Sequence, residues 1–335
     1  MKCARPHIAT AAASIKVNKA SRCPASEDDR SHPLKHQTDQ RDHSVEALLG
    51  QLVSVAFHGT AYGMILYVIS VGLSVTMGLM GFANLAHGVF AMAGGYVMLS
   101  MMNAYGLPFP LALAIAFVAV ALGSIVLERL LYARLYAAGE LAQVLFTIGL
   151  ILMSIAVARL IYGTLQQPVN LPDYMKGQFH LLGRDFPAYR VIVILFSLTL
   201  VMLLWFGVER TRWGAMLRAA VDNRAMAQSI GINTSKLFTL TFALGSGLAA
   251  IGGGMGAELI AIQPTYPFEH LVFFLIVVAI GGMGTLRGPF VAALLIGVTD
   301  TACKYWLPQF GAFFIYAATI AILLWRPAGL FGKAA

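Results

Sequence analysis

The stretch "GFANLAHG" places an asparagine, a histidine and two glycines between two long apolar runs. Amide and imidazole groups need hydrogen-bond partners, and lipid hydrocarbon offers none. Asn84, His87 and Gly88 are therefore candidates for a translocation pathway, because polar residues inside a membrane are functional candidates by default. The alternative is structural: the Asn84 and His87 side chains would satisfy backbone groups that are freed where a helix breaks.

A second stretch, "GGMGTLRG", interrupts another apolar run and is followed by proline. Glycine and proline both disfavour a continuous helix, so a break is predicted at Gly281, Gly282 and Gly284. Paired interruptions in the two halves of a transporter point toward its solute route. We therefore expect both breaks to lie beside such a route, although the similarity is too small to show an internal repeat.

Two ionisable residues lie in the apolar segment after this break. Asp300 and Lys304 are four residues apart with the acid first, so they share a helix face and can form a buried ion pair. Such a pair either holds the structure together or takes part in the pathway. The sequence leaves both readings open.

Motifs for catalysis, nucleotide binding and metal binding are missing from the sequence. The nearest approach to a phosphate-binding loop is the terminal "GLFGKAA", which has the wrong spacing and no Ser or Thr after its lysine. Neither a Gly-x-Ser-x-Gly elbow nor an H-E-x-x-H pair occurs. The three cysteines, Cys3, Cys23 and Cys303, have the spacing of neither a disulfide framework nor a zinc site. We expect no cofactor, no metal and no enzymatic activity in this chain.

The composition places these residues in a membrane. The chain is 59% hydrophobic and 11% charged, whereas soluble domains carry roughly 25% charged residues. A spanning helix needs about 20 mostly apolar residues. Candidate spans lie at 48–80, 85–102, 108–128, 141–162, 191–208, 237–260, 268–283, 289–306 and 310–325. The fold class is predicted as an all-α integral membrane protein, a polytopic bundle of about eight or nine spans with broken helices.

Residues 1–46 differ from the rest of the chain. They hold eight basic and six acidic residues and no long apolar run. This composition predicts a disordered extension. The membrane domain is expected to cover 47–333.

The polar segment 209–236 determines the expected orientation. It holds five basic and two acidic residues, a net charge of +3, and should therefore be cytoplasmic. Within it, 214–231 is too charged to span and predicts one short helix with a mild apolar stripe, formed by Met216, Ala219, Ala220, Asn223, Ala227 and Ile230. Gly231 fits the helix end and Asn233 a new N-cap. The segment is either a surface helix held to anionic lipid by its arginines or a docking element for a cytoplasmic partner.

Four separated blocks resemble the permease subunits of ABC importers for branched-chain amino acids. They are "GLMGFANLAHGVFAMAGGYV", "RAAVDNRAMAQSIGINTSKLFTLTFALGSGLAAIGGGM", "AIGGMGTLRGPFVAALLIG" and "LLWRPAGLFG". The resemblance covers about 46–333 in register. The same family includes relatives thought to serve urea and short amides, so the solute is less closely defined than the family.

The resemblance implies a multi-pass subunit of a bacterial inner membrane that works by alternating access. It implies four kinds of neighbour: a second permease subunit, in a heterodimer or a homodimer, two cytoplasmic ABC ATPase subunits, a periplasmic solute-binding protein and the lipid bilayer. No nucleic-acid partner is expected. The segment 214–231 matches the family's cytoplasmic coupling segment, and the positions carried over are Arg218, Asp222, Arg224 and Gly231.

Two rival functions remain open at this point. An ion-coupled secondary transporter would need buried carboxylates near the midplane, and the sequence offers few. A membrane-embedded enzyme or sensor would need a cluster of His, Asp or Glu within the bilayer, and no such cluster is evident in the sequence.

Overall fold

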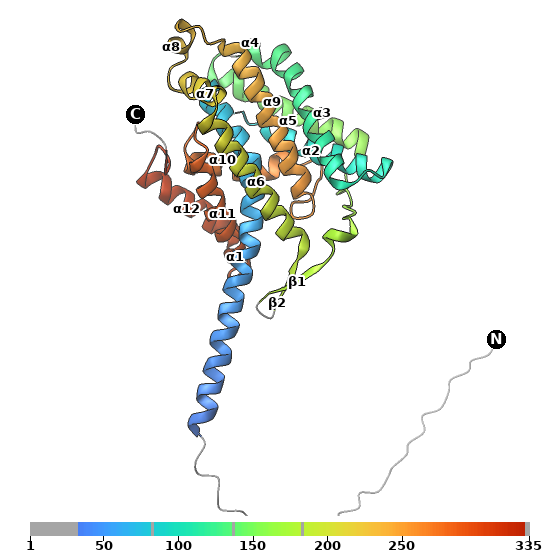
Figure 1. The fold of residues 1–335 in the computed structure, drawn as a ribbon, viewed down its shortest axis with the longest axis vertical. Helices are drawn as coiled ribbons and strands as arrows, with labels where there is room; N and C mark the ends of the chain where they lie inside the picture. The colour runs from blue at the N-terminus through green and yellow to red at the C-terminus, as the bar shows by residue number, and fades with distance from the viewer. Residues whose placement is uncertain (1–32, 82–83, 136–137, 182–183, 332–335) are drawn as a thin grey trace, which may run out of the picture. The chain divides into compact units, whose positions relative to one another are not determined.

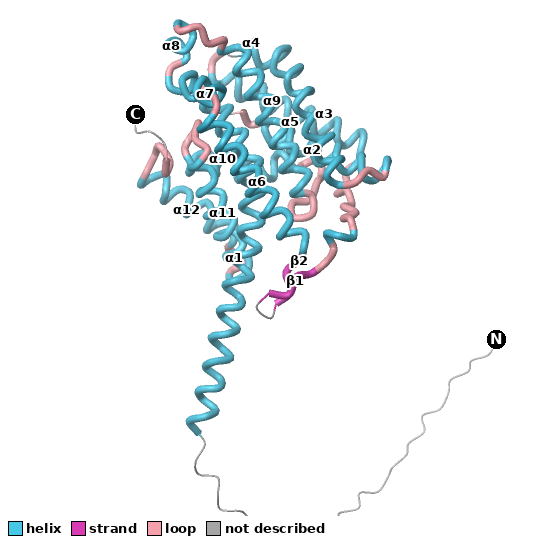
Figure 2. Tube along the Cα trace, viewed as in Figure 1, coloured by secondary structure: helices cyan, strands magenta, loops and turns pink. Residues whose placement is uncertain are grey.

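A computed structural model describes residues 33–81, 84–135, 138–181 and 184–331. The chain divides into two compact units, Met1–Leu48 and Leu49–Ala335. The larger unit is a helical bundle (Figure 1) with one short hairpin, β1 (Gln178–Leu181) paired antiparallel with β2 (Arg184–Pro187) (Figure 2). Of the predicted extension, residues 1–32 lie outside the described residues, and the first helix begins at Pro33.

Every candidate span is helical. The helices are α1 (Pro33–Met80), α2 (His87–Tyr105), α3 (Phe109–Leu127), α4 (Ala133–Leu135), α5 (Glu140–Tyr162), α6 (Ala188–Arg210), α7 (Arg212–Asp222), α8 (Arg224–Ser229), α9 (Thr234–Gly256), α10 (Tyr266–Gly281), α11 (Arg287–Trp306) and α12 (Gly311–Trp325). A π-helical turn, η1 (Glu128–Tyr132), follows α3, and a 3-10 turn, η2 (Asp173–Met175), precedes the hairpin.

Five helical segments are long and apolar enough to cross a membrane. They are Leu48–Gly78, Phe109–Leu135, Glu140–Tyr162, Ala188–Arg210 and Thr234–Gly256. Tyr266–Gly281 and Phe313–Trp325 are apolar but shorter. The predicted helical, polytopic membrane fold is confirmed, and the long candidate 48–80 is one uninterrupted helix.

Helix α9 lies at the centre of the bundle and packs against α2 and α3. In its most apolar stretch 78% of the residues are buried, against 11% in α6. A helix with apolar side chains all round must be covered by protein or by lipid. The apolar surface of α6 is therefore free for lipid or for a second subunit.

The close packing around α9 depends on small residues. Gly72 of α1 faces Gly245 of α9, and a Cβ at Gly72 would lie 2.4 Å from the Gly245 carbonyl oxygen. Gly253 of α9 similarly meets Ala91 of α2. Without a hydrophobic driving force between helices in lipid, such backbone contacts supply much of the packing energy.

The bundle has two ends that can be told apart by their contacts. At one end, here called the α7 end, Arg287 at the start of α11 pairs with Glu209 near the end of α6. At the opposite end, the hairpin end, Arg184 of β2 donates a hydrogen bond to Ser54 of α1 at 3.0 Å. Helix α10 runs toward the α7 end, and α11 runs away from it.

The packing at Gly253 generates a stability prediction. A Cβ there would lie 2.0 Å from the Ala91 carbonyl oxygen, so Gly253→Ala should destabilise the fold by about 1–3 kcal/mol through overpacking. Thermal unfolding in detergent, followed by tryptophan fluorescence, measures the change. Gly149→Ala on α5 is the control, because no heavy atom lies within 4 Å of its Cβ position. Equal unfolding temperatures for the two variants would contradict this account of the α2 and α9 contact.

Candidate functional site

The first predicted break separates α1 from α2. Asn84 is buried there, and its Oδ1 accepts hydrogen bonds from the Ala86 backbone N–H at 3.1 Å and from the Tyr132 hydroxyl at 2.9 Å. Its Nδ2 has no hydrogen-bond partner among the described residues. The amide oxygen therefore stabilises the break, and the amide nitrogen is left with unused donor capacity.

His87 and Gly88 join this break to two other helices. The His87 Nε2 lies 3.0 Å from the Ile69 carbonyl oxygen of α1, and a carbonyl can only accept, so Nε2 carries the proton. A Cβ at Gly88 would lie 3.2 Å from Cα of Pro267 in α10. The break is thus a buried junction of α1, α2 and α10.

The hydrogen-bond partner of Asn84 in the π-helical turn was not predicted from the sequence. Tyr132 belongs to the π-helical turn η1, which also holds the buried Glu128. The Thr239 hydroxyl of α9 donates to Glu128 Oε2 at 2.8 Å. π-Helical turns are rare and occur often at functional sites. A glutamate at the end of the apolar run 108–128 was the available signal, but its burial could not be read from the sequence.

The second predicted break separates α10 from α11. Gly282 and Gly284 have φ angles of +98° and +75°, a region that glycine adopts without strain. The Gly284 backbone N–H donates to the Ser74 carbonyl of α1 at 3.0 Å, and the Ser74 hydroxyl donates to the Thr285 carbonyl, also at 3.0 Å. A Cβ at Gly281 would lie 2.4 Å from the backbone nitrogen of Pro289. The turn is therefore fixed against the α7 end of α1.

The predicted coupling segment forms two short helices instead of one. Asn223 ends α7 with extended backbone angles, and its side chain caps α8 by accepting from the Met226 backbone N–H at 3.0 Å. Within the predicted apolar stripe, Ala220 and Ala227 are buried as expected, whereas Met216 and Ile230 are 39% and 66% exposed.

The predicted helix stop and restart after this segment are confirmed. Gly231 has a φ of +88° and follows α8, and Asn233 caps α9 by accepting from the Lys236 backbone N–H. The segment is therefore bounded by capped helix ends. The segment has exposed apolar side chains on Met216, Met226 and Ile230, which are candidates for contact with a partner.

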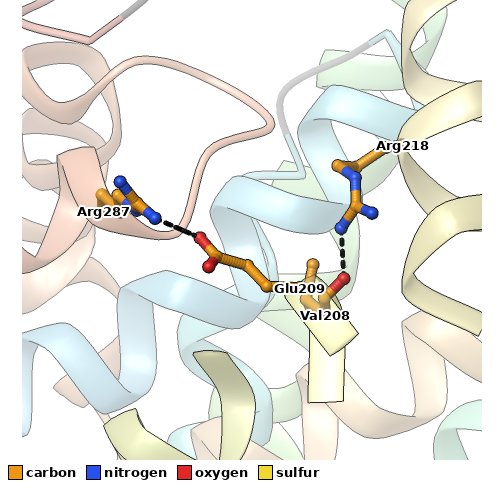
Figure 3. A network of polar contacts seen from close by, with 4 residues as sticks. All are labelled: Val208, Glu209, Arg218 and Arg287. Atoms are coloured by element: carbon orange, nitrogen blue, oxygen red, sulfur yellow. Dashed lines mark hydrogen bonds and ion pairs between the residues drawn. The ribbon is translucent and has the colours of Figure 1, made fainter. Parts of the chain in front are cut away.

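The arginines of the segment face different partners. Arg218 is exposed, and its guanidinium donates to the carbonyl of Val208 (Figure 3). The neighbouring Glu209 pairs with Arg287, with 2.5 Å between Oε1 and Nη2. The Arg224 guanidinium lies 4.5 Å from the centroid of the Phe238 ring. Asp222 is exposed at the end of α7.

The two breaks and the coupling segment meet at the α7 end. A cavity of about 490 Å³ is lined by Met77, Gly78, Gly81, Glu140, Gln143, Val144, Val221 and Met283. A Cβ at Gly284 would lie 3.1 Å from Val221 Cγ1, and a Cβ at Gly78 would lie 2.4 Å from Gly284 Cα. Helix α7 therefore contacts the second break directly, and that break contacts α1 just before the first.

A larger cavity, of about 530 Å³, lies between α1, α3, α6, α7 and α9 and has apolar walls except for Thr241 and the indole of Trp213. Of the two breaks it includes only Leu286, at the end of the second. Asp300 and Lys304 are remote from the second break, in the last two turns of α11, with 2.6 Å between Lys304 Nζ and Asp300 Oδ2. Among the described residues, no group of three or more His, Cys, Asp or Glu side chains could hold a metal ion.

Sequence comparison identifies similar proteins over most of the chain. A family model described as "Branched-chain amino acid transport system / permease component" matches residues 55–323. The matched range includes both breaks and the coupling segment. No solved structure matches the chain significantly.

Several curated relatives align over most of their length. The high-affinity branched-chain amino acid transport system permease protein BraD of Pseudomonas aeruginosa is 24% identical over 298 residues, covering 85% of this chain and 96% of BraD. The corresponding protein LivH of Escherichia coli strain K12 is 24% identical over 83% of this chain and 94% of LivH. LivM of the same strain is 24% identical over 80% of this chain and 68% of LivM.

The contact between α7 and the second break generates a prediction about transport. Gly284→Ala should slow solute uptake roughly tenfold more than Gly81→Ala, a difference that about 1.4 kcal/mol in the barrier would produce. Both glycines have φ near +75°, so both variants carry the same backbone strain. Only the Cβ at Gly284 meets Val221, whereas nothing lies within 4 Å of the Cβ position at Gly81.

Uptake into membrane vesicles with equal amounts of inserted protein provides the measurement. Adding Val221→Ala to Gly284→Ala should restore part of the rate, because it removes the methyl that the new Cβ meets. Equal rates for the two single variants would show that the contact with Val221 has no role.

Proposed function

The chain belongs to the family of branched-chain amino acid transport permeases, and on that premise we propose that it is the membrane-spanning subunit of an ATP-driven importer for branched-chain amino acids. The match over residues 55–323 carries this proposal. BraD and LivH, which align with it almost end to end, are named as high-affinity branched-chain amino acid permeases. The bilayer is that of a bacterial inner membrane.

The α7 end faces the cytoplasm in this proposal. The net charge of +3 over 209–236 supports that side, because Lys and Arg near span ends are retained inside. Two ABC ATPase subunits dock on 214–231, where Arg218, Asp222 and Arg224 lie on the surface together with the exposed Met226 and Ile230. Exposed apolar side chains with arginine are typical of protein contacts.

ATP binding in the partners then moves α7. The displacement of α7 is transmitted from Val221 to Gly284 and then to Gly78 of α1, because these groups are in van der Waals contact. Packed helices respond to such a push by shifting as units, because interiors are too dense to absorb it. The cavity at the α7 end, beside both breaks, is the proposed inner mouth of an alternating-access pathway.

A second permease subunit completes the pathway. Helices α5 and α6 are apolar yet mostly exposed, with 22% and 11% of their most apolar stretches buried, so they require lipid or protein cover. LivM, which aligns with 80% of this chain, represents a second permease type in the same transport system. A periplasmic solute-binding protein delivers the amino acid to the hairpin end.

Two alternatives make different predictions. Relatives for urea or amides would use the same fold with another solute. An ion-coupled secondary transporter would work without an ATPase and would need a buried carboxylate that binds the coupling ion. Asp300 is a candidate for such a group, but Lys304 neutralises it.

Energy coupling is tested by reconstituting the chain in vesicles with its partner permease, ATPases and binding protein. Uptake of radiolabelled leucine should require ATP and should stop when hydrolysis is blocked by an ATPase-subunit variant. The control imposes a proton or sodium gradient without ATP. Uptake driven by that gradient alone would eliminate the importer proposal in favour of secondary transport.

Docking is tested by charge reversal on the coupling segment. Arg218→Glu should weaken co-purification of the ATPase by roughly tenfold or more, because truncating or reversing a charge at an interface costs about 2–5 kcal/mol when the pair is desolvated. The matched control is Arg159→Glu, an exposed arginine in the last turn of α5, at the hairpin end. If both variants retain the ATPase equally well, Arg218 does not take part in docking.

A further inference from the structure

A polar cluster lies on α1, α10 and α11, away from the second break and from the coupling segment. It consists of Tyr62, Tyr266, His270, Asp300 and Lys304, here called the Asp300 cluster. Tyr266 and His270 are in the first turns of α10, and Asp300 and Lys304 are in the last turns of α11. Since α10 ends and α11 begins at the α7 end, the cluster lies toward the hairpin end.

Close contacts link the members of the cluster. Lys304 Nζ is 2.6 Å from Asp300 Oδ2 and 5.6 Å from the centroid of the Tyr62 ring. The Tyr266 and His270 rings stand edge to face, with 4.6 Å between centroids. Asp300, Lys304 and Tyr62 are therefore in contact across α1 and α11, and Tyr266 and His270 form a second contact on α10.

The hydrogen bonding of this cluster is incomplete. Asp300 Oδ1, the Tyr266 hydroxyl and His270 Nδ1 are buried and have no partner among the described residues. The Asp300 side chain is only 3% exposed, and Tyr266 is fully buried. Buried polar atoms without partners are uncommon and destabilising, so each one calls for an explanation such as a ligand that supplies the missing bond.

The chemistry of these atoms without partners indicates what class of ligand would bind them. A carboxylate accepts only, so the free Oδ1 of Asp300 needs a donor, and an ammonium group supplies up to three. Lys304 is 62% exposed, and its ammonium donates only, so a ligand carboxylate is its natural second partner. An acid and a base four residues apart on one helix face thus present the two charges that complement an α-amino acid zwitterion.

We infer that the Asp300 cluster is a binding subsite for the zwitterionic head of an α-amino acid, with its ammonium on Asp300 and its carboxylate on Lys304. The subsite deepens the proposed function, on which it rests. It receives the solute at the hairpin end, and the apolar side chain of the solute is left to other parts of the pathway. Such a subsite accepts amino acids and rejects urea and amides, which lack both charges.

Two single variants test the subsite. Asp300→Asn keeps the side-chain shape and removes the negative charge, and Lys304→Gln changes a mostly exposed residue whose replacement the fold should tolerate. Each should lower ATP-driven leucine uptake at saturating binding protein at least tenfold, with unchanged complex yield. Asp173→Asn is the matched control, because Asp173 forms an exposed ion pair with Lys176 in the loop before the hairpin.

A charge swap separates the subsite from a purely structural ion pair. Asp300→Lys combined with Lys304→Asp restores attraction within the pair but reverses the charges that face the solute. A structural pair predicts that the swap restores transport, and this result would overturn the subsite. The subsite predicts that transport stays lost. If the swapped protein does not assemble, the subsite is tested by Lys304→Gln and by ligand competition instead.

Ligand competition uses the purified permease and ATPase complex without binding protein. Leucine should displace bound radiolabelled leucine, whereas leucinamide, isocaproate and urea should compete at least tenfold more weakly. Lys304→Gln should remove the preference for leucine over leucinamide, and Asp300→Asn the preference for leucine over isocaproate. Preferences unchanged in both variants would overturn the subsite while ATP-driven leucine uptake by the wild type still supports the proposed function. Loss of ATP dependence in the wild type would instead reject that function itself.

Discussion

Backbone hydrogen bonding at the two helix breaks is the constraint on which this structure depends. A chain that leaves its helix inside a membrane exposes amide and carbonyl groups, and hydrocarbon cannot pair them. The protein meets this requirement with neighbouring helices. Ser74 of α1 bonds the Gly284 turn through both its backbone and its hydroxyl, and Asn84 bonds Ala86 and Tyr132. The breaks are consequently also the places where helices are tied together.

Small residues make these ties possible. Gly78 and Gly284 let α1 and the second break approach until their backbones touch, with Val221 of α7 against the same turn. A short rigid route therefore leads from the exposed coupling segment to the interior. In contrast, the apolar faces of α5 and α6 make few contacts within the chain, which suits surfaces reserved for lipid and for another subunit. The Asp300 cluster lies at the other end of α11 and, in contrast to these apolar faces, is polar.

The membrane spans and the two helix breaks could be predicted because their sequence signals are local. Apolar length and helical period identify spans, and the two glycine stretches coincide with the breaks between α1 and α2 and between α10 and α11. The coupling segment was only partly predictable. Its ends at Gly231 and Asn233 follow from capping chemistry, but Asn223 both ends α7 and caps α8, and Met216 and Ile230 of the predicted stripe are exposed. The π-helical turn, with buried Glu128, was not predicted because a single turn is too short to establish a period of its own in the sequence.

The sequence by itself determined that this is a helical membrane protein with two broken helices, a basic coupling segment and an acid and base pair on one helix face. Each follows from composition or from a spacing within one helix. Only the tertiary structure decided that Val221 meets Gly284, that Asn84 meets Tyr132, and that Tyr62 lies beside Lys304. These neighbours are far apart in the chain, and helix pairing depends on surface shape that local periodicity does not encode.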